Sequence, residues 1–109
     1  MSMEQIADRL AALGNATRIE IYRLLVRAGH TGLPVAGLQT QLGIPASTLS
    51  HHLRKLLEVD LVTQVRSGTT LMCHADFSVM EACFSLFIDE CCADETKTQA
   101  CGADKAPRC

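Results

Sequence analysis

The first 72 residues of this 109-residue chain contain no cysteine, and all six cysteines lie between Cys73 and Cys109. A disulfide-stapled secreted domain would spread its cysteines through the part that folds, so this class of protein is disfavoured. The chain also has no apolar run near the roughly 18 residues that a membrane span needs. Its start, Met1–Gln5, lacks the basic and apolar regions of a signal peptide. We therefore expect a cytoplasmic protein, in which clustered cysteines are typical of metal binding or redox chemistry.

Motifs of common enzyme classes are missing as well. The chain has no glycine-rich phosphate loop, nucleophile elbow or paired-carboxylate arrangement, so we expect no enzymatic activity. Its length predicts one domain with one modest core. The formal net charge is −2, but residues 1–75 carry seven Lys/Arg and five Asp/Glu, whereas residues 76–109 carry three and seven. These counts give +2 and −4, so a polyanionic partner would contact the first three quarters of the chain.

Apolar residues at helical spacing predict four helices in the first sixty residues. The third and fourth of these helices are short, amphipathic and joined by a turn at Gly43, which is the helix-turn-helix pattern. The expected boundaries are a first helix that stops at Gly14, a second from Asn15 to about Ala28, a third that begins at Pro34, and a fourth that begins at Pro45 or Ala46.

After Leu61 the apolar period changes from that of a helix to that of a strand. Two β-rich runs flank a turn at Ser67-Gly68, which predicts a hairpin. A helix-turn-helix followed directly by a hairpin is the winged-helix arrangement. The expected fold class is therefore mainly α with a β-hairpin wing (α+β), a winged helix-turn-helix that occupies residues 1–92.

A last helix is expected from about Phe77 to Cys91, with two apolar stripes. Two apolar faces exceed what one small core needs, so we expect this terminal helix to pack against a second chain in a homodimer. The alternative is a fully buried core helix. Residues 93–109 contain no Val, Leu, Ile, Phe or Met, which predicts a flexible tail in the absence of a ligand.

The outer face of the fourth helix suits the major groove of DNA. Short polar side chains in its first turns can hydrogen-bond to base edges and phosphates. Basic side chains behind them and on the hairpin can reach phosphates. The alternative is a solvated face with good capping residues. The candidate DNA-binding residues are Ser47, Thr48, Ser50, His51, Arg54, Lys55 and Arg66.

Three segments together resemble the ArsR/SmtB family of metal- and metalloid-responsive bacterial repressors. Leu13–Arg18 is similar to the family's entry to its second helix, Ser47–Leu56 resembles its recognition helix with a Ser-x-His-Leu core, and Gly68 lies where the wing turns. The resemblance implies a homodimer that binds an inverted-repeat operator when empty and releases it when an inducer binds. His52 matches the family's helix histidine, and we expect it to support the recognition helix, with a role as a metal ligand as the alternative.

Two sensor sites known in the family are missing from this chain. Residues 38–42 lack the Cys-Val-Cys motif of the original arsenic sensors, and residues 77–92 contain no histidine for the site of the zinc and nickel sensors. Cys73, on a strand, and Cys83, on an apolar helix face, are expected to be small core residues.

The remaining candidate ligands are Cys91, Cys92 and Cys101, with Cys109 as an alternative third ligand. Adjacent residues on a helix diverge by about 100°, so Cys91 and Cys92 can bind one ion only if the helix ends there. Three thiolates form a soft ligand set that suits trivalent arsenic or antimony, whereas zinc needs a fourth ligand. The tail is also similar to that of arsenic repressors with vicinal cysteines after the last helix.

We therefore expect an arsenite-responsive repressor whose inducer is trivalent arsenic or antimony, with no organic cofactor. The alternatives are a thiol-based redox sensor, or a sensor of organoarsenicals or of soft metals such as cadmium and zinc, on the same fold.

Overall fold

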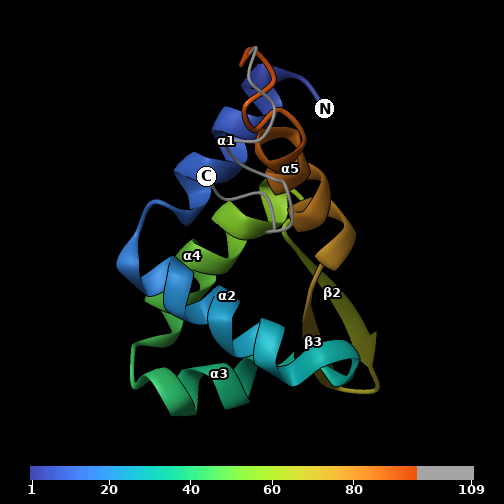
Figure 1. Cartoon of the computed structure of the whole chain (residues 1–109). Helices are drawn as coiled ribbons and strands as arrows, with labels where there is room; N and C mark the ends of the chain where they lie inside the picture. Colours follow the sequence, from blue (N-terminus) through green and yellow to red (C-terminus); the bar gives the residue numbers. More distant parts are fainter. Residues whose placement is uncertain (96–109) are drawn as a thin grey trace.

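The computed structural model describes residues 1–95, which form five α-helices, one short 3-10 helix and a three-stranded antiparallel sheet (Figure 1). In chain order the elements are α1 (Met3–Leu13), α2 (Ala16–Ala28), η1 (Gly29–Thr31), β1 (Leu33–Pro34), α3 (Val35–Leu42), α4 (Ala46–Glu58), β2 (Val62–Ser67), β3 (Thr70–Ala75) and α5 (Phe77–Asp89).

The arrangement is the expected winged helix-turn-helix. Helices α3 and α4 are joined at Gly43, which adopts the left-handed conformation at φ 66°, ψ 34° that glycine accommodates without strain. Strands β2 and β3 form the wing, and their register runs from Val62 opposite Ala75 to Ser67 opposite Thr70. The helical part and the wing share one core, so the wing is held at a defined place beside α4.

The core lies between α2, α3, α4 and the sheet. Helix α4 contributes its leucine face, and Leu49, Leu53 and Leu56 are almost completely buried. Burial of this face against α1, α2 and β2 orients the opposite face of α4 outward. The fully buried large side chains are Ile21, Leu25, Leu38, Leu49, Leu56, Leu61, Val62, Cys73 and Cys83.

Several expected boundaries differ from the structure. Leu33 and Pro34 form the short strand β1, which pairs with Cys73 and Met72 of β3, and Pro34 is the N-cap of α3 and not its first residue. A two-residue strand carries no periodicity that a sequence pattern could reveal. The wing turn consists of residues 68 and 69, not Ser67-Gly68, because Ser67 still pairs with Thr70.

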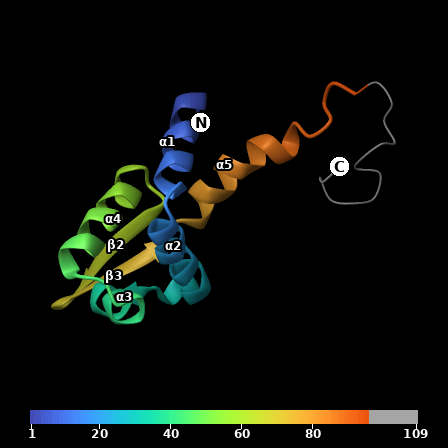
Figure 2. The ribbon, with the colours of Figure 1, turned by 90° about the vertical axis from the view of Figure 1, so that its left-hand side faces the viewer.

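Helix α5 extends away from the rest of the described chain, on the side opposite the wing and α3 (Figure 2). Its first half is anchored to the core through Phe77, Val79 and Met80. Its second half is exposed, with Phe87 53% and Ile88 50% accessible. The alternative of a fully buried core helix is therefore wrong for the single chain.

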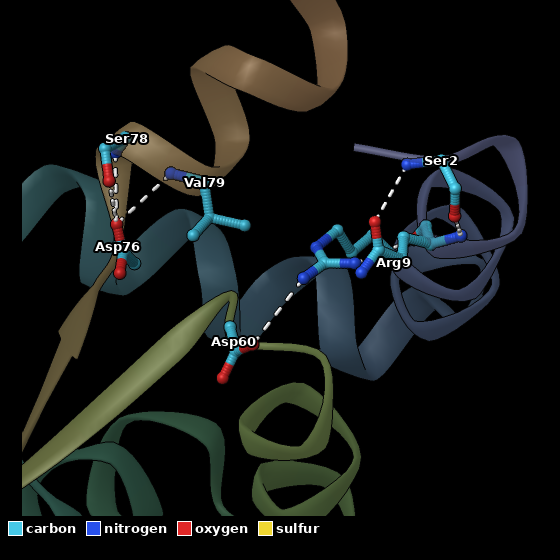
Figure 3. Close-up of polar contacts among 7 residues, drawn as sticks. Ser2, Arg9, Asp60, Asp76, Ser78 and Val79 are labelled. Carbon is cyan, nitrogen blue, oxygen red and sulfur yellow. Dashed lines mark hydrogen bonds and ion pairs between the residues drawn. The ribbon is translucent and has the colours of Figure 1, made fainter.

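A buried arginine joins α1 to the turn that follows α4 (Figure 3). Nη1 of Arg9 donates to the carbonyl of Gln5 at 2.9 Å, and Nη2 lies 3.6 Å from a carboxylate oxygen of Asp60. Asp60 has a φ of 65°, a left-handed conformation that ends the helix and starts the wing. Across residues 1–95, no helix combines the length and apolar character that crossing a bilayer requires.

Asp76 caps α5 at the point where β3 ends (Figure 3). Its Oδ1 accepts hydrogen bonds from the Ser78 hydroxyl at 2.7 Å, the Ser78 amide at 3.1 Å and the Val79 amide at 3.2 Å. The Ser78 hydroxyl lowers the pKa of Asp76 below its ordinary value of 3.8, and the two amides act in the same direction, against the opposing effect of burial.

We predict that Asp76→Ala lowers the free energy of unfolding by about 1 kcal/mol, because the first amides of α5 lose their acceptor. The folded-state pKa lies below the unfolded one, so the capping contribution is present above the ordinary pKa and is lost as pH falls through the lowered value. Urea denaturation at fixed protein concentration tests this at pH 7 and pH 3. Equal destabilisation at both pH values would contradict it, and Asp76→Asn, which keeps an acceptor, is the matched control.

Candidate nucleic-acid interface and cysteine site

The exposed face of α4 carries most of the expected DNA-binding residues. Ser47, Ser50, His51 and Arg54 are all exposed and follow the spacing i, i+3, i+4, i+7, which places them along one stripe. This stripe lies opposite the buried leucine face. The chain therefore presents hydroxyl, imidazole and guanidinium groups, in that order, along one outward edge of the helix.

A groove of about 290 Å³ separates this stripe from the wing. Ser50 and Arg54 line it from α4, and Gln64 and Leu71 line it from the wing. Arg66 is also exposed on β2, opposite Leu71. Helices α3 and α4 and the wing thus form one side of the molecule, and α5 leaves from the other (Figure 2).

Two expected residues lie beside the stripe and not on it. Thr48 and Lys55 are exposed, but at helical spacing they occupy the neighbouring flank of α4. Lys55 lines a different groove, of about 440 Å³, together with Asp8 of α1 and Arg18 of α2. In the single chain Lys55 thus lies near α1, away from the wing.

Beneath this flank, Arg18 bridges three helices. Its Nε donates to the carbonyl of Ala12 in α1 at 2.6 Å, and its Nη1 lies 3.3 Å from Nδ1 of His52 in α4. Since a guanidinium only donates, Nδ1 is the acceptor, which assigns the imidazole proton to Nε2. Burial lowers the pKa of His52 below its ordinary value, and the positive charges of Arg18 and His51 lower it further. The expectation that His52 supports the helix is consistent with this contact.

The vicinal cysteines lie just beyond the end of α5. The helix stops at Asp89, two residues earlier than expected, and residues 90–94 form turns. Cys92 adopts a left-handed φ of 62°, and the Cys91 amide donates to the Ile88 carbonyl at 3.2 Å. As a result the two sulfurs are 3.5 Å apart, and both residues are half-buried. The condition that the helix must end for both sulfurs to share one ion is therefore met.

The other cysteines divide into two groups. Cys73 and Cys83 are buried in the described structure, at 0% and 1% exposed, as expected of core residues. Burial raises the pKa of Cys73, and the Gln64 side chain donates to its sulfur at 3.4 Å. Cys101 and Cys109, the candidate third ligands, lie outside the described residues, as does most of the segment expected to form a flexible tail. Within residues 1–95, no group of three or more His, Cys, Asp or Glu side chains could hold a metal ion.

Sequence reasoning did not identify Arg18 or Gln64 as parts of these sites. Arg18 is 34 positions from His52, so no local pattern connects the two residues. Gln64 lines the groove beside α4 because the pairing of β2 with β3 sets which residues of the wing face α4. This register is not visible in the sequence.

Comparisons with known proteins agree with this architecture. Residues 13–65 match the model of a helix-turn-helix domain family. No curated protein sequence matches the chain.

Several solved structures, including the following three, are similar to the chain. NolR from Sinorhizobium fredii is 30% identical over 77% of this chain and 82% of its own, with a TM-score of 0.62. The Mycobacterium bovis protein Mb0332, a homodimeric winged helix-turn-helix DNA-binding domain described as a possible ArsR-family transcriptional regulator, is 26% identical over 87% of this chain and 88% of its own, with a TM-score of 0.66. A possible transcriptional regulator for arsenical resistance is 28% identical over 83% of this chain and 98% of its own, with a TM-score of 0.60.

The helix-turn-helix match, the wing packed against α4 and these relatives together identify the family: the chain belongs to the ArsR family of winged-helix transcriptional regulators.

Proposed function

We propose that this regulator is an arsenite-responsive repressor, which binds operator DNA as a homodimer and releases it when trivalent arsenic binds to thiolates at the end of α5. The observation that carries the proposal is the pair of cysteine sulfurs 3.5 Å apart at the end of a helix that projects from a winged helix-turn-helix.

The exposed stripe of α4 supports DNA binding. Ser47, Ser50 and His51 can read base edges, while Arg54, which lines the groove, and Arg66, which is exposed on the wing, can approach phosphates. Thr48 and Lys55 lie on the flank of α4, and from there they would contact the sugar-phosphate backbone of the DNA. In a two-fold dimer the two recognition helices would lie about 34 Å apart, one turn of DNA, which suits an inverted repeat.

Exposed apolar side chains support a dimer through the terminal helices. Leu10, Ile19, Tyr22, Met80 and Phe84 line an apolar groove of about 500 Å³ between α1, α2 and α5. Phe87 and Ile88 continue this surface along α5 and are about half exposed. Such a surface is costly to leave in water. A second copy of the chain would cover it, as the homodimeric relative from Mycobacterium bovis suggests.

The donor set at the end of α5 supports a soft trivalent ligand. A metal–thiolate bond of about 2.3 Å allows two sulfurs on one centre to be up to about 4.6 Å apart. The Cys91 and Cys92 sulfurs, at 3.5 Å, lie within this limit. Cys101, or Cys109 in its place, would supply the third sulfur that arsenite or antimonite requires. The arsenical-resistance regulator among the relatives points to the same class of inducer.

Arg54 gives the test of DNA binding. We predict that Arg54→Ala weakens binding to all duplexes and reduces the salt dependence by about one released counterion per protomer. Fluorescence anisotropy with promoter DNA between 50 and ~200 mM salt measures this slope. Arg27→Ala removes an exposed arginine from α2, outside the stripe and the wing, and should leave the slope unchanged.

Phe87 tests the dimer surface. We predict that Phe87→Glu converts the dimer to a monomer, because a carboxylate would be buried against the apolar face of the partner. Sedimentation velocity measures the state of association. Glu81→Gln, an exposed change on the same helix, is the control. A dimer that survives Phe87→Glu would place the interface elsewhere.

The cysteines separate a metalloid sensor from a redox sensor. We predict that arsenite releases the DNA complex with reductant present, and that Cys91→Ser and Cys92→Ser abolish this release without weakening DNA binding. Cys83→Ala, on the same helix but buried in the core, should leave the response unchanged. Release that requires an oxidant and reverses with dithiothreitol would instead establish the redox alternative.

The third ligand is tested in the same assay. Cys101→Ser should abolish the response to arsenite but spare the response to a methylarsenical, which binds only two thiolates. Cys109→Ser should be silent if Cys101 is the third ligand. Full induction by arsenite in the Cys101→Ser/Cys109→Ser double variant would show that Cys91 and Cys92 are the whole site.

A further inference from the structure

We propose that Arg18 and His52 are positioning residues for operator binding, which hold the recognition helix α4 at a fixed angle to α1 without contacting the DNA themselves. This inference rests on the proposed DNA-binding function. It adds a contact that connects the recognition helix α4 to the helices that border the proposed dimer surface.

The geometry that carries the inference is a single guanidinium shared by three helices. Arg18 belongs to the first turn of α2. Its backbone amide donates to Oδ1 of the N-cap Asn15 at 3.1 Å, and its side chain extends toward α1 and α4. Its Nε donates to Ala12 near the end of α1 at 2.6 Å, and its Nη1 to His52 in α4 at 3.3 Å. Because the guanidinium is planar and rigid, these two bonds fix the distance between α1 and α4.

The position of His52 on α4 makes this contact relevant to DNA. His52 directly follows His51, which lies on the exposed stripe, and the two rings form an edge-to-face contact with centroids 5.5 Å apart. His52 is half-buried and points to Arg18, so it is a support behind the reading face. Loss of the bond between Arg18 and His52 would let α4 rotate or tilt. The side chains that contact bases would then move out of hydrogen-bonding distance.

The contact requires a neutral imidazole. The groups that face this region are Arg18 from α2, His51, Lys55 and Glu58 from α4, and Asp8 from α1. Burial and the adjacent positive charges hold the pKa of His52 below its ordinary value, so the neutral form persists at neutral pH. As pH falls through that lowered pKa, protonation removes the acceptor and places two positive charges side by side. Operator binding should weaken in the same range.

The test compares Arg18→Met, His52→Leu and His52→Asn. The amide oxygen of asparagine takes the place of Nδ1 and does not titrate. Anisotropy is measured with a labelled duplex that carries the inverted repeat of the protein's own promoter and with a scrambled duplex of equal length, at pH 8 and pH 5.5. Circular dichroism and sedimentation verify that each variant is a folded dimer.

We expect Arg18→Met and His52→Leu each to raise the operator Kd about tenfold at pH 8, equivalent to about 1.4 kcal/mol. The double variant should be no weaker than either single variant, because the two residues act as one unit. The salt slope and the affinity for the scrambled duplex should not change. His52→Asn should bind the operator within about twofold of the wild type and should lose part of its acid sensitivity.

Three results would overturn the inference. Arg18→Met could reduce the salt slope, which would make Arg18 a direct phosphate contact. The two single effects could multiply in the double variant, which would make them independent. His52→Asn could bind as weakly as His52→Leu, which would make the packing of the ring the important property.

A measurement without DNA separates this inference from the proposed function. NMR titration of the His52 ring in the free dimer should show an unprotonated Nδ1 at neutral pH, and Arg18→Met should move its pKa up toward the ordinary value. If this signature is present but the wild type does not prefer the operator to the scrambled duplex, the proposed function is wrong and the contact stands. If the signature is missing while the operator is bound, the inference is wrong and the proposed function stands.

Discussion

Burial of the leucine face of α4 is the constraint on which the rest of the structure depends. Leu49, Leu53 and Leu56 are 0–3% exposed, and each would cost about 2–5 kcal/mol to truncate in a well-packed core. With this face fixed inward, Ser47 and Ser50 on the opposite face must point to solvent. The same leucines pack beside the wing and α2, so the position of every candidate DNA-binding group follows from one hydrophobic contact.

Polar contacts of two arginine side chains then connect α4 and the turn after it to α1 and α2. Arg9 reaches Asp60 at the end of α4, and Arg18 reaches His52 in its middle. Both arginines come from the part of the chain that borders the apolar surface proposed for dimer contact. A change in the way two protomers pack would therefore reach α4 through charged, directional contacts as well as through the core. Such contacts have defined geometries, which suits a two-state response.

The proposed ligand site is far from the reading face, because α5 leaves the molecule on the opposite side (Figure 2). Under the proposed function, arsenic bound at Cys91 and Cys92 would not touch DNA from there, and its effect would pass through the dimer surface. A change in operator occupancy from about 99:1 to 1:99 needs a difference of about 5.5 kcal/mol between the two states. Two sites per dimer, each with a coupling free energy of about 1–3 kcal/mol, come close to this requirement.

The sequence by itself determined the helix-turn-helix, the wing and the outward face of α4, because apolar spacing, the Gly43 turn and strand alternation are local signals. It also identified the cysteine pair and the condition under which both sulfurs could face one ligand. Only the tertiary structure decided that α5 ends at Asp89 and so meets this condition. The tertiary structure was also needed to show β1 and the contact between Arg18 and His52. Strand pairing and a hydrogen bond across 34 positions depend on how distant segments pack, and neither leaves a periodic pattern in the sequence.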